Sequence, residues 1–281
     1  MGIIKKLRDW KSGINLGSFL GRELVRTTMK EMWVDLPTHR VYSHIHISEI
    51  IGRRPGIVIV PGANSPGTDY DKGVSLSASE IASCGFTVLH YDPSGRGKTE
   101  GKEDYWGPAH QRELAEVMHY FSSLPEVAHE DIGILSFSIG ITIAVGALVR
   151  FDVPEVRYIF DWEGPSNRFN ITRNDTHRPL MDFPTSKDEF WNEREAARFI
   201  CEIKCGYFRY QAEKDHMQEN YKGHAIELLN NATCGKASWT KCNDNPANTL
   251  FDGKKTNEYN WVPRHLNHKG LILKYLLELQ R

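Results

Sequence analysis

DIGILSFSIGITIAVGALVR, residues 131–150, is an apolar run that small residues interrupt near its middle. Its first half, residues 132–135, is typical of a buried strand, and its second half carries Ala, Val and Leu at helical spacing. Ser138 lies in the sharp turn between the two halves, with Gly140 two residues further on. This pattern predicts a nucleophile elbow, in which a strand-to-helix turn presents a reactive serine hydroxyl.

The composition excludes several classes of protein. The chain has 281 residues, enough for one α/β domain with an insertion. Its 35 lysines and arginines nearly balance 36 aspartates and glutamates, so no strong field attracts nucleic acid or an anionic membrane. The five cysteines are scattered without zinc-ligand spacing, and the N-terminus lacks the apolar core of a signal peptide. We therefore expect a cytoplasmic protein with no stable membrane insertion and a small-molecule substrate.

The N-terminal segments predict an extension followed by a hairpin. Residues 1–31 begin with alternating apolar and basic positions, which predict a helical extension packed on the main domain, residues 32–281. Residues 32–49 alternate as strands around a break at Pro37, which predicts an antiparallel hairpin at a sheet edge. His44 and His46 share one face of the second strand. No carboxylate or cysteine partner is evident nearby in the sequence, so we expect a solvated strand face and no metal site.

Short apolar segments recur along the rest of the chain. Residues 56–60, 85–92, 156–161 and 206–211 have the pattern of strands buried on both faces of a mostly parallel sheet. Helical patterns alternate with them, which indicates an α/β fold with helices flanking the sheet. Residues 164–203 lose this regularity until a helix expected over 189–203, so we predict a lid insertion there. Its aromatic residues either bind substrate or cap the core: Phe183, Phe190 and Trp191.

The loop after the second parallel strand contains a misleading motif. Gly97-Lys98-Thr99 ends like a phosphate-binding P-loop, but Asp92 stands where the first glycine belongs. A carboxylate there would repel a phosphate, and the following residues are polar loop instead of helix. We interpret the loop as a tight glycine turn at the floor of a cleft, and the nucleotide-binding alternative is the weaker one.

Three candidate residues occur in the order Ser, Asp, His: Ser138 at the strand-to-helix turn, Asp215 just beyond a later strand, and a histidine before the last helix. A serine hydroxyl needs a base to take its proton and a carboxylate to orient that base. Because the carboxyl ends of parallel strands meet along one crevice, we predict Ser138 as nucleophile, Asp215 as acid and His268 as base. The amides of Ile139 and Ala63 would form the oxyanion hole.

Alternatives remain open for two of these roles. Asp161 or Glu163, which follow the preceding strand, are the other candidates for the acid. His265 lies in the same polar loop as His268. We favour His268 because it opens the final helix, whose N-terminus would keep its imidazole neutral.

Over residues 32–281 the chain resembles the α/β-hydrolase superfamily, near its esterase, dienelactone-hydrolase-like and prolyl-oligopeptidase-like members. The similar pieces are Val60-Pro61-Gly62 for the oxyanion loop, residues 92–97 for the turn often written DxRGxG, residues 136–140 for GxSxG, and residues 213–215 for the acid. Ser136 replaces the first elbow glycine and Ser94 replaces the usual arginine. Neither departure removes a reacting group.

The sequence thus predicts a serine hydrolase that cleaves a carboxylic ester or related acyl bond through an acyl-enzyme, with no metal or organic cofactor. Peptidase or acyltransferase activity on the same triad is one alternative, and a non-catalytic interaction module on a hydrolase-like fold is another. The sequence does not specify the substrate or the oligomeric state.

Overall fold

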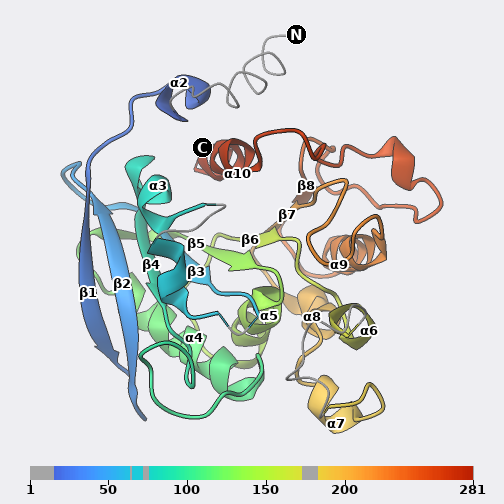
Figure 1. Cartoon of the computed structure of the whole chain (residues 1–281), viewed down its shortest axis with the longest axis horizontal. Coiled ribbons are helices and arrows are strands. Elements are labelled where there is room, and N and C mark those ends of the chain that lie inside the picture. The colour runs from blue at the N-terminus through green and yellow to red at the C-terminus, as the bar shows by residue number, and fades with distance from the viewer. Residues whose placement is uncertain (1–15, 64, 72–75, 173–182, 281) are drawn as a thin grey trace.

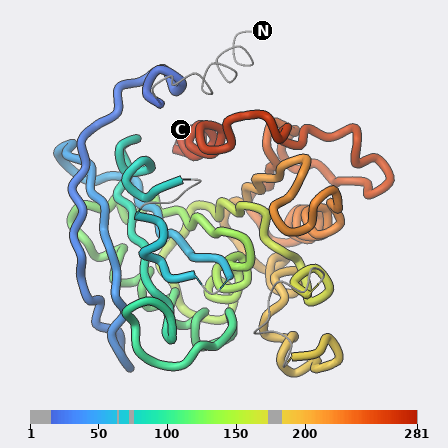
Figure 2. Tube along the Cα trace, viewed as in Figure 1, coloured from blue at the N-terminus to red at the C-terminus, as the bar shows by residue number. Residues whose placement is uncertain are grey.

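The fold is built around one twisted, mostly parallel sheet with helices on both faces (Figures 1 and 2). The computed structural model describes residues 16–63, 65–71, 76–172 and 183–280. Within these ranges the sheet has eight strands, in the order β1-β2-β4-β3-β5-β6-β7-β8. In chain order the strands are β1 (Thr27–Asp35), β2 (Arg40–Ser48), β3 (Arg54–Val60), β4 (Thr87–Tyr91), β5 (Val127–Phe137), β6 (Tyr158–Trp162), β7 (Gly206–Tyr210) and β8 (Thr240–Cys242).

The predicted hairpin forms one edge of this sheet. β1 pairs antiparallel with β2, and β2 pairs antiparallel with β4, whereas every pair from β4 to β8 is parallel. β1 begins at Thr27, inside the segment assigned above to a helical extension, so the sheet begins earlier than the sequence indicated. A short helix, α2 (Leu16–Leu20), precedes it, and residues 1–15 of the predicted extension lie outside the described residues.

The two faces of the parallel strands are covered by different helices. Along β3, Ile57 and Ile59 pack with α3 (Ala78–Ser83) and α10 (His268–Glu278), while Val58 and Val60 pack with α4 (Pro108–Ser122) and α5 (Gly140–Arg150). This alternation follows from the two-residue period of a strand. A further core cluster joins α5, α8 (Ala196–Phe199) and α9 (Gly223–Cys234) over β6 and β7.

The segment predicted as a lid, residues 164–203, is made of short helices. They are α6 (Arg168–Ile171), α7 (Asp188–Trp191), α8 and the 3-10 helix η4 (Ile200–Glu202). The helix expected over 189–203 is interrupted because Glu195 is extended and its carboxylate accepts a 2.8 Å hydrogen bond from Arg168 Nε. Residues 173–182 lie outside the described residues.

Two of the three aromatic residues singled out above, Phe183, Phe190 and Trp191, belong to the core. Trp191 is fully buried and Phe190 is nearly so, and both pack in the cluster below α4 and α5. Phe183 is half-buried and stacks on Phe190 at 4.0 Å between ring centroids. Phe190 and Trp191 therefore cap the core, one of the two roles considered above.

His44 and His46 do not lie on a solvated face as expected. Their exposed fractions are only 5% and 4%, because the face of β2 that carries them is covered by the 3-10 helix η2 (Gly67–Asp71). The carboxylate partner that the sequence did not reveal is Asp71, which contacts both rings. The contact joins residues 25 and 27 positions apart, which no local motif reveals.

Among the described residues, no helix combines the length and apolar character needed to cross a membrane.

Candidate active site

Ser138 lies on the turn between β5 and α5, as the sequence predicts. Its φ of 51° is in the left-handed region, which a non-glycine residue adopts only under constraint. The Ser138 amide donates a 2.8 Å hydrogen bond to the Trp162 carbonyl on the neighbouring strand, which holds the turn in place. A Cβ on Gly140 would lie 2.8 Å from the Val60 carbonyl oxygen, so this position requires glycine. These are the features of a nucleophile elbow.

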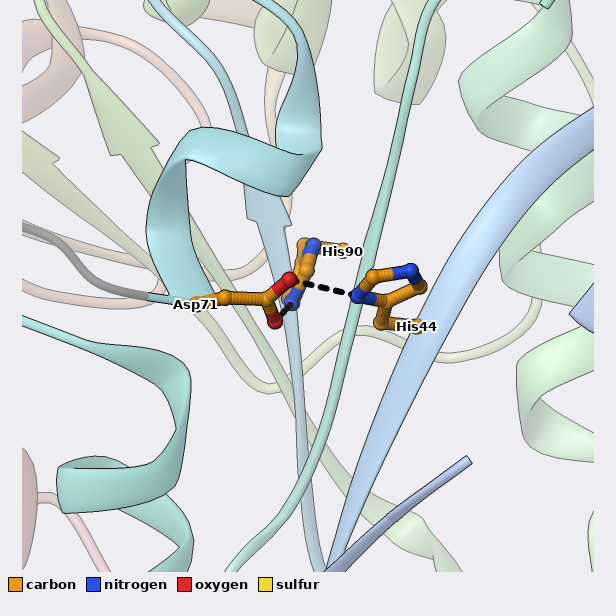
Figure 3. A group of neighbouring side chains, drawn as sticks. All are labelled: His44, Asp71 and His90. Carbon is orange, nitrogen blue, oxygen red and sulfur yellow. Dashed lines mark hydrogen bonds and ion pairs between the residues drawn. The ribbon is translucent and has the colours of Figure 1, made fainter. Parts of the chain in front are cut away.

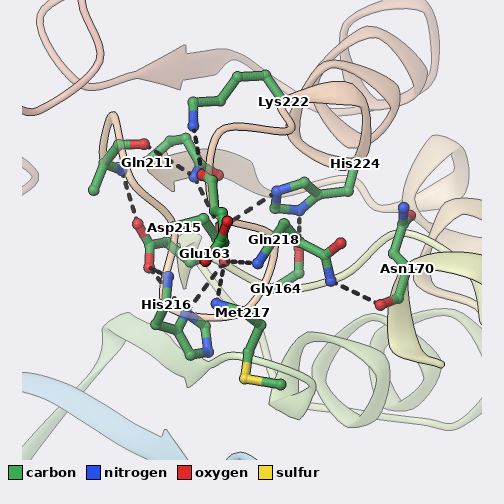
Figure 4. A network of polar contacts seen from close by, with 12 residues as sticks. Glu163, Gly164, Asn170, Gln211, Asp215, His216, Met217, Gln218, Lys222 and His224 are labelled. Atoms are coloured by element: carbon green, nitrogen blue, oxygen red, sulfur yellow. Dashed lines mark hydrogen bonds and ion pairs between the residues drawn. The ribbon is translucent and has the colours of Figure 1, made fainter. Parts of the chain in front are cut away.

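The histidine beside Ser138 is His216, in the loop after β7. His216 Nε2 lies 3.0 Å from Ser138 Oγ. On the other side of the ring, His216 Nδ1 lies 2.9 Å from Glu163 Oε2, and Figure 4 shows these two residues. The three side chains therefore form a continuous chain from hydroxyl to imidazole to carboxylate. This is the arrangement in which a histidine acts as general base on a serine.

The structure does not bring His268 to Ser138, which corrects the assignment made from the sequence. His268 begins α10, where its Nδ1 contacts the Tyr210 hydroxyl at 2.7 Å and its Nε2 lies 3.4 Å from the Arg264 carbonyl oxygen. His265 lies exposed in the preceding loop. His216, which the sequence analysis did not single out, follows Asp215 directly in the loop after β7, where either an acid or a base is expected.

Asp215 supports the loop that carries His216. Asp215 Oδ1 accepts hydrogen bonds from the amides of Met217 and Gln218, both at 2.8 Å, and it lies 3.5 Å from His216 Nδ1. The Glu163 contact to the same nitrogen is shorter, at 2.9 Å. The carboxylate that binds His216 directly is thus Glu163, one of the alternatives left open above, and the predicted Asp215 is displaced to a supporting position.

Glu163 is fixed by its position at the end of β6. Its φ is 54°, its exposed fraction is 4%, and its Oε1 accepts a 2.8 Å hydrogen bond from the Ala212 amide. Its Oε2 also accepts from the His216 amide at 3.2 Å. Because both oxygens have donors, the carboxylate is held in one orientation toward the imidazole.

The surrounding charges raise the pKa of His216 above its ordinary value. Burial alone would lower that pKa, but the hydrogen bond to Glu163 and the nearby charge of Asp215 outweigh it. The imidazolium is the form that these carboxylates stabilise, and it is also the form that a general base adopts after taking a proton.

A buried arginine lies below these residues. Arg209 on β7 is fully buried and pairs with Asp161, the other alternative acid, at 2.5 Å. Arg209 also donates to the Gly164 carbonyl at 2.7 Å and to Gln211 Oε1 at 2.6 Å, and Gln211 in turn donates to Asp215 at 2.9 Å. Asp161 is therefore occupied in a structural ion pair.

The two predicted oxyanion-hole residues flank Ser138 in the fold. Ile139 follows it and caps α5, while Ala63 lies in the loop after β3 with a φ of 41°. This loop packs directly on the elbow, since a Cβ on Gly62 would lie 2.6 Å from the Phe137 carbonyl oxygen. The Ala63 carbonyl accepts a 2.7 Å hydrogen bond from Trp106 Nε1. Neither the Ala63 nor the Ile139 amide donates a hydrogen bond within the part of the chain that the structure describes.

No family model matches the sequence, and no curated protein matches it. Solved structures do match the fold. An acylaminoacyl peptidase from Pyrococcus horikoshii superposes with a TM-score of 0.66 at 12% identity, covering 94% of this chain and 43% of that one. An esterase from Pyrococcus furiosus superposes with a TM-score of 0.59 at 15% identity, covering 80% of this chain and 83% of that one. Acetyl xylan esterase 1 from Thermoanaerobacterium superposes with a TM-score of 0.55 at 14% identity, covering 99% of each chain. The chain spans less than half the length of the first peptidases that it matches.

The chain has the α/β-hydrolase fold. The crevice at the carboxyl ends of its parallel strands is where this arrangement of strands places ligands. Ser138, Glu163 and His216 follow β5, β6 and β7, three neighbouring strands of the sheet.

In this α/β-hydrolase fold, Asp92 holds the glycine-rich loop at residues 92–99 in a tight turn. The Asp92 carboxylate accepts hydrogen bonds from the Thr68 amide at 3.0 Å and the Lys98 amide at 2.9 Å. A Cβ on Gly97 would lie 2.0 Å from Asp92 Oδ2. The loop amide that a phosphate would need is bound to a carboxylate, which supports the tight-turn interpretation over the P-loop one.

Proposed function

We propose that the protein is a serine hydrolase that cleaves an acyl bond through a covalent acyl-enzyme. The observation that carries the proposal is the continuous contact from Ser138 Oγ to His216 Nε2 and from His216 Nδ1 to Glu163. Ser138 is the nucleophile, His216 the general base and Glu163 the residue that orients the base. In this assignment His216 and Glu163 take the roles first given to His268 and Asp215.

The reaction proceeds in two halves. Ser138 Oγ attacks the acyl carbon while His216 Nε2 takes the hydroxyl proton, and the Ala63 and Ile139 amides hydrogen-bond the resulting oxyanion. Collapse of this intermediate breaks the bond to the leaving alcohol or amine, which receives the proton from His216. A water molecule then repeats the sequence on the acyl-enzyme, releasing the carboxylic acid and restoring the Ser138 hydroxyl. No metal or organic cofactor takes part in these steps.

A fluorophosphonate probe tests the nucleophile directly. We expect the probe to label the wild-type protein at Ser138, with labelling lost in Ser138→Ala. Ser136→Ala is a matched control, because Ser136 lies in the same elbow with a fully buried side chain. Labelling that persists in Ser138→Ala, or that disappears equally in both variants, would contradict the proposal.

Within this reaction class we propose carboxylic ester as the substrate bond. Support comes from the two esterases above, which match over most of their own length, whereas the peptidases match over less than half of theirs. Turnover of p-nitrophenyl acyl esters should exceed that of aminoacyl p-nitroanilides. The reverse order would make the protein a peptidase, and transfer of the acyl group to an added alcohol in preference to water would make it an acyltransferase.

The proposed enzyme acts on a small acyl substrate. The alternative from another class is a non-catalytic interaction module with a hydrolase fold. It would be supported if a broad panel of esters and amides showed no turnover and Ser138 also failed to react with the probe.

A further inference from the structure

Three histidines of β2 and β4 meet an aspartate of η2, separated from the strand that leads to Ser138 by β3. Figure 3 shows His44, Asp71 and His90 of this cluster. Asp71 Oδ2 lies 2.6 Å from His44 Nδ1, and Asp71 Oδ1 lies 3.0 Å from both His46 Nε2 and His90 Nε2. The last two nitrogens are 3.2 Å apart. His44, Asp71 and His90 each offer a metal-binding atom within 4.8 Å of the other two, and His46 contacts the same Asp71 oxygen as His90.

The fold sets this arrangement. His44 and His46 are two residues apart on β2 and so share a face, and His90 on β4 pairs directly with His44 across the antiparallel ladder. Asp71 ends η2, which places its carboxylate over that face. The rings of His44, His46 and His90 are almost wholly buried, whereas the Asp71 side chain is 20% exposed, which leaves a path by which an ion reaches the cluster.

The hydrogen bonds around His44 leave an acceptor facing another acceptor. The Tyr42 hydroxyl donates to Glu31 and accepts from Lys98 Nζ at 2.7 Å, so its remaining lone pair accepts the His44 Nε2 hydrogen at 2.9 Å. In a neutral His44 ring with its hydrogen on Nε2, Nδ1 is an acceptor, and here it faces a carboxylate oxygen. Two acceptors at that separation need a proton or a cation between them.

The other two rings meet their partners only through the nitrogens that face Asp71. His46 Nδ1 and His90 Nδ1 are buried and make no hydrogen bond to a described residue. The facing Nε2 atoms of the two rings approach each other and the same Asp71 oxygen. Three such atoms, each about 2.1 Å from a tetrahedral ion, would be about 3.4 Å apart, which is only a few tenths of an ångström more than the separations here.

We propose that His44, His46, His90 and Asp71 bind a divalent transition-metal ion of the zinc class. Three neutral imidazoles and one carboxylate form a donor set suited to zinc or cobalt and poorly suited to calcium or magnesium, which prefer oxygen. The His44 hydrogen bond to Tyr42 supplies the outer contact that fixes a metal-bound imidazole in one tautomer.

The ion would join the edge hairpin to the segment that carries the oxyanion loop. Asp71 is connected through η2 to the loop containing Ala63, while the three histidines belong to β2 and β4. The site does not depend on the proposed function, because it contains none of the residues that contact Ser138.

Metal binding by the chelator-stripped, full-length protein tests the proposal. We expect one equivalent of zinc per chain by elemental analysis, sub-micromolar affinity by calorimetry, and with cobalt the intense visible absorption of a tetrahedral site. Zinc at 100 times its dissociation constant should raise the midpoint of thermal unfolding by roughly 5 °C. Failure of the wild-type chain to bind either metal at 10 µM overturns the proposal, whatever its hydrolase activity.

Variants locate the site. Asp71→Asn and His90→Gln should each weaken zinc binding by about 100-fold or more, while His129→Ala, which removes an exposed histidine, should leave it unchanged. Circular dichroism of each variant before zinc is added shows whether it is folded. If His90→Gln does not fold, the more exposed Asp71→Asn variant provides the test. Zinc affinity that is equal in Asp71→Asn and the wild type would instead identify binding elsewhere and overturn the assignment.

Discussion

Among individual residues, the two carboxylates near His216 have different contacts and should have different importance. Glu163 binds the imidazole directly, whereas Asp215 holds the loop amides of Met217 and Gln218. We expect Glu163→Gln to lower kcat/KM by about 10³–10⁴-fold, because the wrong tautomer is then stabilised. Asp215→Asn keeps an oxygen for the two amides and should cost about 10-fold or less. Steady-state kinetics of both variants on one ester measures the two losses of kcat/KM. Equal losses would contradict the assignment of Glu163 as the acid.

The same reasoning separates the histidines. His216→Ala should lower kcat by at least about 10³-fold, as loss of a general base in a triad does. His268→Ala removes a contact with Tyr210 and should leave kcat within about threefold of the wild type. A large loss of activity in His268→Ala, with His216→Ala unaffected, would restore the assignment made from the sequence.

The pKa of His216 gives the pH dependence a definite sign. The base must be unprotonated to act, and its pKa is raised above the ordinary value of 6.5. The acid limb of kcat/KM should therefore have its midpoint above 6.5, with activity lost as the pH falls below it. Glu163→Gln removes the largest favourable contact of the imidazolium, so its midpoint should move to lower pH. A pH–rate series on both proteins measures the shift, and an upward movement in the variant would be inconsistent with the geometry.

Sequence reasoning at this scale located the elbow turn and the loops, but not every side chain that contacts Ser138. The turn was predictable because one local pattern specifies it. The contact with His216 was not, because Asp215 and His216 are adjacent and the sequence does not show which of them points toward the elbow. His268 was a reasonable choice by position, but its ring is engaged by Tyr210, a contact that only the packing of α10 on β7 creates.

Among the elements, β6 and β7 are joined by the buried pair of Asp161 and Arg209. Both side chains are fully buried, so Arg209→Met would leave an unpaired charge and should lower the free energy of unfolding by about 3–5 kcal/mol. Adding Asp161→Asn to that variant should recover much of the loss. As a control, Lys236→Met breaks an exposed pair with Glu202 and should leave the unfolding midpoint unchanged. Urea titration followed by circular dichroism compares them, and no recovery in the double variant would argue against an electrostatic cause.

The parallel strands were predictable, and the errors fall where contacts between elements decide. β3, β4, β6 and β7 are short, mostly apolar strands buried on both faces, a pattern typical of the central strands of a parallel sheet. The start of β1 was missed because residues 27–31 are polar except for Met29 and are mostly exposed at an edge, so their pairing with β2 leaves little trace in the sequence. The helix expected over 189–203 was interrupted by the ion pair of Glu195 with Arg168, which joins residues far apart in the chain.

On the scale of the whole molecule, stability should depend on the middle of the sheet far more than on its connecting loops. Ile134 on β5 is fully buried between β3 and β6, in the core below α4 and α5, whereas Ile51 in the turn before β3 is 96% exposed. Ile134→Ala removes the same atoms as Ile51→Ala but leaves a cavity, so it should lower the free energy of unfolding by about 2–5 kcal/mol.

Ile51→Ala should change that free energy by no more than about 0.5 kcal/mol. Urea titrations of the two variants and the wild type measure the difference, with equal slopes required for a valid comparison. Ester hydrolysis by Ile134→Ala at low temperature should stay near the wild-type rate, because the substitution lies below the crevice and away from Ser138. If the two alanine variants were equally stable, β5 would not be the buried centre on which the elbow depends.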